Sequence, residues 1–137
     1  MNESQELLQF HHIGIACGDL QREIESHNKL GYMIEGEMFS DPIQHVKGQF
    51  MTLGKFRVEI LEAISSPSPI DNYLKSNCKM YHQAYECDQL SAAMSWMRKQ
   101  GAKLIAGPNR AVAFQGREIA FFLLRNSIMV ELIQKRI

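Results

Sequence analysis

The sequence of this chain repeats itself at an offset of 70 residues, and this repeat limits the possible folds more than any other feature. Four residues recur in identity 70 positions later: His12 as His82, Cys17 as Cys87, Leu20 as Leu90 and Gly31 as Gly101. Beyond the second glycine the offset becomes 72, which aligns Val58-Glu59-Ile60 with Val130-Glu131-Leu132. Self-similarity at a fixed offset is the sequence sign of a repeated structural unit. We therefore expect two equivalent modules.

The spacing of apolar residues predicts the same order of elements in both halves. Residues 10–17 favour a strand, and residues 19–30 favour a helix that Asp19 caps and Gly31 ends. Three β-like stretches follow at 32–39, 48–53 and 56–64. The second half is predicted to contain a strand at 81–87, a helix from Asp88 to Gly101, and β-like stretches at 103–105, 111–114, 119–124 and 128–133. Each module is thus predicted to be βαβββ.

The length of 137 residues suits one ordinary domain, so we treat residues 1–137 as a single domain. Module one is predicted to span residues 9–64 and module two residues 79–135. The linker between them, residues 65–78, contains a predicted short helix with Ser68 as its cap and Pro69 as its first residue. The predicted fold class is α+β, with the two modules forming one curled mixed sheet around a shared site.

The charge totals exclude some classes of function. Fifteen basic and fifteen acidic side chains give a net charge of zero, so the totals show no electrostatic footprint for nucleic acid or an anionic membrane. The amino terminus is polar, and the longest apolar run is far shorter than the about 20 residues that cross a bilayer. Three cysteines without C-x-x-C spacing favour reduced thiols, with Cys17 and Cys87 buried. We expect a cytoplasmic protein that binds a small molecule.

Each module carries one histidine near the start of its first strand and one glutamate inside its last strand. Taken singly, Glu59 or Glu131 can face solvent on an alternating strand. The recurrence of both residue types favours burial, because a pseudo-twofold axis would bring His12 and His82 to the two glutamates. Buried carboxylates are costly without a cation. Imidazole and carboxylate ligands suit one divalent ion, which can be Co, Zn, Ni, Mn or Fe, and four protein ligands leave room for substrate on a six-coordinate ion.

Four strings of residues carry a resemblance to a known family. They are His11-His12-Ile13-Gly14-Ile15-Ala16, Val58-Glu59-Ile60-Leu61-Glu62, Tyr81-His82-Gln83-Ala84-Tyr85-Glu86 and Val130-Glu131-Leu132. These strings resemble the vicinal oxygen chelate superfamily, which includes glyoxalase I, extradiol dioxygenases, bleomycin resistance proteins and methylmalonyl-CoA epimerase. The resemblance covers residues 9–135. Within the superfamily the chain looks most similar to methylmalonyl-CoA epimerase, because Leu61-Glu62-Ala63-Ile64 runs into Ser68-Pro69-Ile70 and Tyr73-Leu74 as in the epimerase linker.

The resemblance implies a glyoxalase-like fold in which His12, Glu59, His82 and Glu131 bind the metal. It also implies that an acyl-CoA thioester loses the proton on the carbon between its thioester and its carboxylate, and that the metal stabilises the enolate. Return of a proton to the other face inverts the carbon. Glu131 is the first choice for the base, and a homodimer is expected because relatives form one.

One departure from the epimerase pattern concerns the second proton donor. Similar epimerases carry a glutamate in the loop before the third strand, whereas this chain reads Asp41-Pro42-Ile43-Gln44-His45-Val46. His45 can replace the glutamate, because its unperturbed pKa lies near 6.5, about where proton transfer is needed. Gln44 can only hydrogen-bond the substrate. Alternatively, Glu59 and Glu131 act from opposite faces.

Two other functions fit the same residues. One is a glyoxalase-like lyase that acts on a thiol adduct, and the other is a non-catalytic protein of this fold that binds a small molecule. Extradiol dioxygenase chemistry is disfavoured, because those Fe(II) enzymes use two histidines and one carboxylate, whereas Glu59 adds a fourth ligand. Arg110 and Arg117 are candidates to meet a CoA phosphate, although solvent-exposed charge is the favoured reading.

Overall fold

The structure is a computed structural model that describes residues 7–136. The polar stretch at the amino terminus, Met1 to Glu6, lies outside the described residues. Backbone contacts divide the chain into two compact units. Residues 12–81 form the first unit, and residues 7–11 together with 82–136 form the described part of the second unit.

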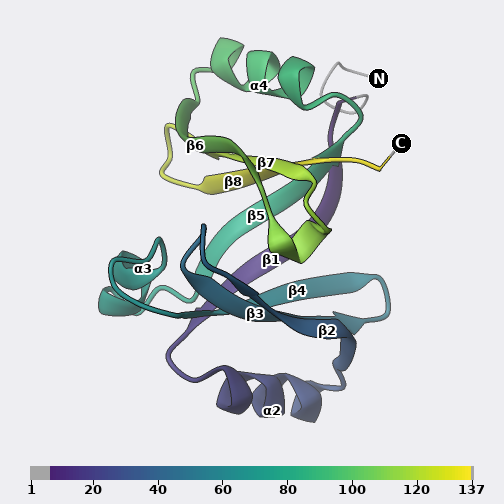
Figure 1. The fold of residues 1–137 in the computed structure, drawn as a ribbon, viewed down its shortest axis with the longest axis vertical. Coiled ribbons are helices and arrows are strands. Elements are labelled where there is room, and N and C mark those ends of the chain that lie inside the picture. Colours follow the sequence, from purple (N-terminus) through teal and green to yellow (C-terminus); the bar gives the residue numbers. More distant parts are fainter. Residues whose placement is uncertain (1–6, 137) are drawn as a thin grey trace. The chain divides into compact units, whose positions relative to one another are not determined.

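The first unit holds the strands of one βαβββ pattern. In chain order its elements are β1 (Gln9–Cys17), whose residues from His12 onward belong to this unit, α2 (Leu20–Leu30), β2 (Met33–Asp41), β3 (Val46–Leu53), β4 (Phe56–Ala63) and α3 (Asp71–Lys75). Strand β1 runs parallel to β4, and β3 pairs antiparallel with both β4 and β2. The strand order is therefore β2-β3-β4-β1 (Figure 1).

The second unit repeats this pattern. Its elements are β5 (Met80–Cys87), whose residues from His82 onward belong to this unit, α4 (Leu90–Lys99), β6 (Lys103–Arg110), the 3-10 turn η1 (Val112–Phe114), β7 (Glu118–Leu123) and β8 (Met129–Gln134). Strand β5 runs parallel to β8, and β7 pairs antiparallel with both β8 and β6. Residues 7–136 thus contain eight strands and three α-helices in two βαβββ patterns, which confirms the predicted α+β fold class.

Helix α2 begins and ends where the sequence predicts. The Asp19 carboxylate accepts a hydrogen bond from the Arg22 N–H at 3.1 Å, and Gly31 adopts the left-handed conformation at φ 104° that ends the helix. Leu20 and Ile24 are the buried residues of the helix, and they pack on apolar side chains of the sheet. Each such burial contributes roughly 2 kcal/mol, so packing of one face holds the helix in place.

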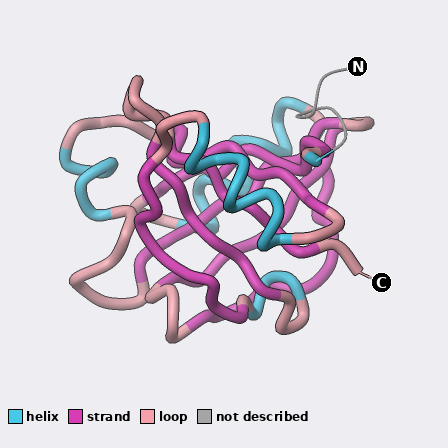
Figure 2. The backbone as a smooth tube through the Cα atoms, turned by 90° about the horizontal axis from the view of Figure 1, so that it is seen from above, coloured by secondary structure: helices cyan, strands magenta, loops and turns pink. Residues whose placement is uncertain are grey.

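Helix α4 covers the strands of the second unit in the same way (Figure 2). Its four buried residues are Leu90, Ala93, Met94 and Met97. They contact Phe122 on β7 and Leu132 on β8, both fully buried. No helix within residues 7–136 combines the length and apolar character needed to cross a bilayer.

A side chain from the last strand of each unit binds the amino terminus of that unit's helix. Glu62 on β4 accepts the Leu20 N–H at 2.7 Å, and Gln134 on β8 accepts the Leu90 N–H at 2.9 Å. These N–H groups have no partner inside their helices. Glu62 and Gln134 are separated by the same offset of 72 that relates the last strands, so the repeat extends to the contacts between elements.

Strands β2 and β6 each contain an irregularity built around a left-handed glycine. The register of β2 shifts between Glu35 and Phe39, with Gly36 at φ 72°, and the register of β6 shifts next to Gly107 at φ 96°. Such conformations suit glycine because it has no Cβ. The buried side chain of Gln49 on β3 donates to the β2 carbonyls of Glu35 at 3.2 Å and Gly36 at 3.1 Å, which stabilises the irregular stretch.

Two local predictions are wrong. Residues 111–114 are not a strand: β6 runs on to Arg110, and the carbonyl of Ala111 then accepts hydrogen bonds from the Phe114 and Gly116 N–H groups, which closes a turn. Ser68 does not cap the linker helix, which begins at Asp71. The Asp71 carboxylate instead accepts the Ser68 N–H at 2.9 Å, so the capping contact runs in the opposite direction.

Candidate metal centre

In the first unit, the structure brings His12 and Glu59 together. His12 lies on β1 and Glu59 in the middle of β4, and their Nε2 and Oε1 atoms are 3.1 Å apart. Both side chains are buried. The residue of β1 opposite Glu59 is Gly14, which has no side chain to compete for the space beside the carboxylate. The parallel pairing of β1 with β4 therefore sets the position of this pair.

In the second unit, His82 and Glu131 form the equivalent pair. His82 Nε2 on β5 lies 3.2 Å from Glu131 Oε1 on β8, and both side chains are buried. Ala84 occupies the place opposite Glu131 that Gly14 has in the first unit. The solvent-facing alternative for the two glutamates is therefore excluded, because both carboxylates lie inside the protein.

Each pair is held by a phenylalanine that sequence reasoning missed. Phe50 on β3 lies opposite Glu59 and packs edge-on against the His12 ring, with ring centroids 5.3 Å apart. Phe121 on β7 lies opposite Glu131 and packs in the same way against His82 at 5.6 Å. The two phenylalanines are 71 residues apart, so alignment of the repeat would have revealed them. They contact the imidazoles edge-on and contribute to the burial of both rings.

The donor atoms of each pair fit a divalent metal ion. Two ligands with bonds of about 2.1 Å at right angles to each other lie about 3 Å apart, close to the separations within both pairs. Imidazole nitrogen and carboxylate oxygen are ligands that divalent transition metals prefer. A buried carboxylate also gains most from a cation nearby, since it has lost its hydration. These buried His–Glu pairs could therefore hold a metal ion.

His45 occupies a different environment. It lies in the turn before β3 with φ 56°, its side chain is exposed, and its Nδ1 is 3.4 Å from the Ser65 Oγ. Its carbonyl accepts the Ile64 N–H. The backbone of His45 is thus held by the shorter hydrogen bond, at 3.0 Å, whereas its exposed ring makes the longer contact, at 3.4 Å.

The acidic residue of the same turn has a structural role. Asp41 is buried, and one of its carboxylate oxygens accepts hydrogen bonds from the N–H groups of Ile43 at 3.0 Å and Gln44 at 3.1 Å. These contacts order the turn in the manner typical of aspartate. The carboxylate is used inside the turn, which leaves His45 as the titratable group that the turn presents to solvent.

His11, which precedes His12 in the sequence, makes a packing contact. His11 alternates with His12 along β1 and is half-buried, with its ring edge-on to Phe114 at 5.7 Å. This is a packing contact within the second unit. Cys17 and Cys87 are buried as predicted, and burial raises the pKa of each thiol to about 11. Neither cysteine is therefore a reactive thiolate near neutral pH.

The fold and the paired sites define the class of protein. The chain belongs to the glyoxalase/bleomycin resistance protein/dioxygenase superfamily, whose family model matches residues 11–121. This confirms the resemblance found in the sequence.

Within this superfamily the similar proteins include epimerases. The ethylmalonyl-CoA/methylmalonyl-CoA epimerase of Cereibacter sphaeroides is 27% identical over 128 residues, which cover 90% of this chain and 95% of that protein. The crystal structure of methylmalonyl-CoA epimerase from Mycobacterium tuberculosis superposes with a TM-score of 0.83 at 20% identity, covering 100% of this chain and 94% of the other. A methylmalonyl-CoA epimerase in complex with methylmalonyl-CoA and ammonium superposes with a TM-score of 0.81 at 22% identity, covering 94% and 95%. At such identities the solved structures support the fold.

Proposed function

We propose that the protein is a divalent-metal-dependent isomerase that epimerises an acyl-CoA thioester, in the manner of methylmalonyl-CoA epimerase. The observation that carries this proposal is the pair of matched, buried His–Glu contacts, one in each unit. Relatives named as epimerases at up to 27% identity support the reaction, and a similar structure that contains methylmalonyl-CoA supports the substrate class.

In this proposal the two pairs bind one ion together. His12 and Glu59 supply one imidazole and one carboxylate, and His82 and Glu131 supply the other two ligands. A divalent ion bound there would polarise the substrate oxygens and stabilise the enolate form. Co, Zn, Ni, Mn and Fe all accept this donor set, so the chain's residues leave the choice among them open.

Proton transfer is assigned to the glutamates first. Glu131 would remove the proton from the carbon between thioester and carboxylate, since its buried carboxylate is held in position beside His82. Glu59 comes from the equivalent strand of the other unit and would act on the opposite face. His45 is the alternative second donor, and its exposed position makes it the weaker candidate.

The hydrogen bonds within the turn before β3 are relevant to two alternative functions. Because the Asp41 carboxylate is bound within the turn, the turn offers no free carboxylate as a second acid. This favours chemistry that needs a single base, as in a glyoxalase-like lyase on a thiol adduct, or a binding protein without catalysis. Both alternatives use the same four ligands, so metal content alone does not separate them.

Deuterium exchange separates these functions. Metal-loaded protein incubated with methylmalonyl-CoA in deuterated water should place deuterium on the α carbon. Glu131→Gln should reduce the exchange rate at least about 100-fold, the usual contribution of a positioned base. His45→Gln should lower the rate of inversion at the α carbon to a similar extent only if His45 is the second donor.

Glu62→Gln is the matched control, because Glu62 lies on β4 three residues after Glu59 but accepts the Leu20 N–H, as Gln134 does for Leu90 in the other unit. It should exchange at the wild-type rate. Absence of exchange in the metal-loaded wild type overturns the epimerase. Turnover of a hemithioacetal would then support the lyase, and ligand binding without turnover would support the binding protein.

A further inference from the structure

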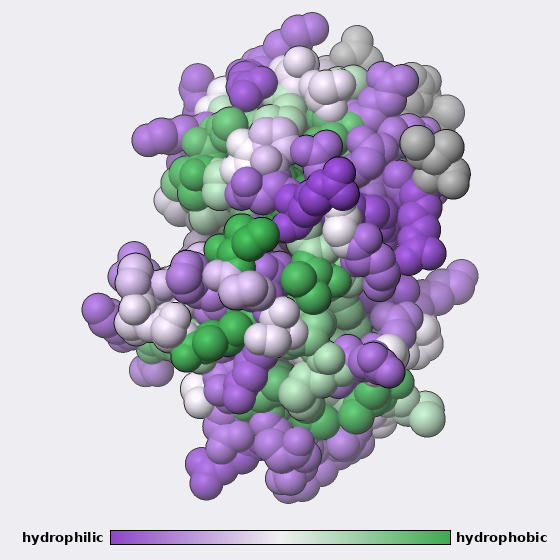
Figure 3. Space-filling model, in the orientation of Figure 1, coloured by the Kyte–Doolittle hydropathy of each residue, from purple (hydrophilic) through white to green (hydrophobic). Residues whose placement is uncertain are grey.

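The described part of the second unit has a net positive charge because it contains few acidic residues. Its described residues contain eight lysines and arginines and four aspartates and glutamates, although the whole chain is neutral. Four of these cations come from the two segments that meet at the turn carrying η1: Arg110, Arg117, Lys135 and Arg136. Figure 3 shows strongly hydrophilic residues over β7 and toward the C-terminus.

The backbone of this turn is closed on itself. The N–H groups of Gln115, Gly116 and Arg117 all donate to carbonyls between Ala111 and Phe114. Gln115 and Gly116 adopt left-handed conformations with φ of 53° and 82°. Because these N–H groups are used, any ligand at the turn must be held by side chains.

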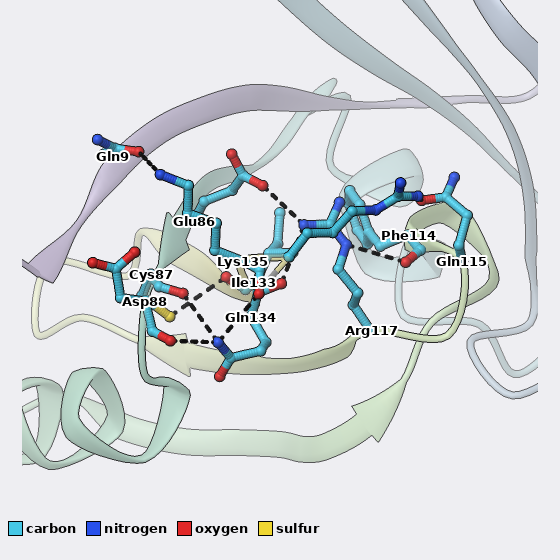
Figure 4. Close-up of polar contacts among 11 residues, drawn as sticks. Gln9, Glu86, Cys87, Asp88, Phe114, Gln115, Arg117, Ile133, Gln134 and Lys135 are labelled. Carbon is cyan, nitrogen blue, oxygen red and sulfur yellow. Dashed lines mark hydrogen bonds and ion pairs between the residues drawn. The ribbon is translucent and has the colours of Figure 1, made fainter.

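Arg117 is fixed in the middle of the turn (Figure 4). Its Nη1 donates to the Glu86 carboxylate at 2.9 Å and to the Gln134 carbonyl at 3.1 Å. Its Nε donates to the Phe114 carbonyl at 3.2 Å. The guanidinium also lies 5.6 Å from the centroid of the Phe114 ring. Glu86 therefore neutralises Arg117 and makes it a rigid support for its neighbours.

The other three cations make no ion pair in the part of the chain that the structure describes. Arg136 donates to the Gln115 side chain at 2.6 Å, and Lys135 to the side chain of Gln9 at 3.3 Å, both neutral partners. The guanidinium of Arg110 is next to Gly116: its Nη1 lies 4.0 Å from the position that a Cβ on this glycine would occupy. Glu118 is the cross-strand neighbour of Arg110, but within residues 7–136 no ion pair joins them. Among the described residues, Arg110 and Arg136 thus have no ion-pair partner, whereas the charge of Lys135 also acts on Glu86.

We propose that Arg110 and Arg136, supported by Lys135 and by the fixed Arg117, form a binding site for phosphate groups. Guanidinium groups suit phosphate because they present paired donors in one plane. This inference rests on the proposed function for its ligand, the phosphate-bearing nucleotide of an acyl-CoA thioester. From Arg117 to Phe121, the residue opposite Glu131, the chain advances four residues, roughly 13 Å in an extended strand. The pantetheine arm of such a thioester is long enough to cover that separation.

A titration with adenosine 3′,5′-bisphosphate tests the site without any catalysis. Calorimetry at low salt should detect binding, and Arg110→Gln/Arg136→Gln should weaken it at least tenfold. The matched control is Lys99→Gln/Lys103→Gln, which removes the same charge from exposed positions elsewhere in the second unit and should change affinity less than twofold. No binding by the wild type, or equal losses in both double variants, overturns the proposal.

Kinetics with two thioesters separate this inference from the proposed function. For methylmalonyl-CoA the arginine double variant should raise KM at least tenfold with kcat unchanged. For methylmalonyl-pantetheine, which lacks the nucleotide, wild type and variant should have the same KM. If neither thioester exchanges, the proposed reaction fails, and the bisphosphate titration still decides whether the site exists. An equal rise in KM for both thioesters contradicts a phosphate site.

Discussion

Glu86 shows how opposing effects on one carboxyl decide its charge. Partial burial alone would raise its pKa, but the hydrogen bond from Arg117 and the charges of His11, Arg117 and Lys135 lower the pKa below its ordinary value. The carboxylate is therefore held ionised beside Arg117. The order of the turn next to β7 depends on that charge, because Arg117 binds Glu86 and the turn with the same guanidinium.

Because the pKa of Glu86 is lowered, the stability of the protein should depend on pH in the acid range. A carboxyl with a lowered folded pKa stabilises the protein above its unfolded value of about 4.3, and the stabilisation disappears as pH falls through the folded pKa. Urea unfolding should show Glu86→Gln to be less stable than wild type by about 1 kcal/mol at pH 7, with the difference shrinking as the pH falls below about 4. Glu118→Gln, at an exposed position, should stay within about 0.5 kcal/mol of wild type at pH 7. A difference for Glu86→Gln that does not change with pH would contradict the assignment.

Gly107 is a residue whose identity the backbone requires. Its φ is 96°, and a Cβ there would lie 2.6 Å from the Ile119 carbonyl oxygen and 3.0 Å from the Ala120 Cα, both backbone atoms that cannot move alone. Gly107→Ala should therefore reduce the free energy of unfolding by about 2 kcal/mol or more. Gly18→Ala is the control, since no atom lies within 4 Å of its Cβ position, and it should be neutral or slightly stabilising. Equal effects of the two changes in urea unfolding would refute the steric argument.

At the scale of elements, sequence predicts best where one local signal dominates. The ends of α2 follow from Asp19 and Gly31, whose effects act within one turn of helix. Residues 111–114 were predicted to be a strand, because Val112 and Phe114 have strand propensity, whereas the hydrogen bonds that fold the turn are accepted by the Ala111 carbonyl. The bulges at Gly36 and Gly107 lie 71 residues apart, so alignment of the halves contains that signal although either glycine alone does not.

Contacts between elements contribute to the free energy of unfolding in ways that strand and helix propensities do not predict. Glu62→Ala and Gln134→Ala each remove the acceptor for a helix N–H and should each lower the free energy of unfolding by about 1 kcal/mol. Glu62→Gln keeps an acceptor oxygen and should lose less than half as much. Guanidinium unfolding monitored by circular dichroism measures all three. A loss for Glu62→Gln as large as for Glu62→Ala would show that the charge, which also pairs with Lys47 at 3.1 Å, is what matters.

At the scale of the molecule, the repeat made the candidate site residues predictable. The charge totals, in contrast, concealed how charge is distributed between the two units. His12, Glu59, His82 and Glu131 were found because the same two residue types recur at the same places in both halves, and each unit buries its pair. The net charge of zero concealed the surplus of cations in the second unit, since totals carry no information on position. The expected homodimer depends on surface complementarity, which the repeat does not encode, and it stays a prediction.

Metal stoichiometry tests whether the two units act together. If the two pairs bind one ion, elemental analysis should find one divalent ion per chain, and His12→Gln and His82→Gln, which remove ligands from different units, should each abolish tight binding. If each pair bound its own ion, the wild type would hold two ions and each variant would keep one. A shared ion would also link the halves energetically, because a ligand at 100 times its Kd stabilises the folded state by about 2.7 kcal/mol. Thermal unfolding should therefore shift upward with metal in the wild type and lose that shift in both variants, whereas retention of half the shift in either variant would contradict a single shared centre.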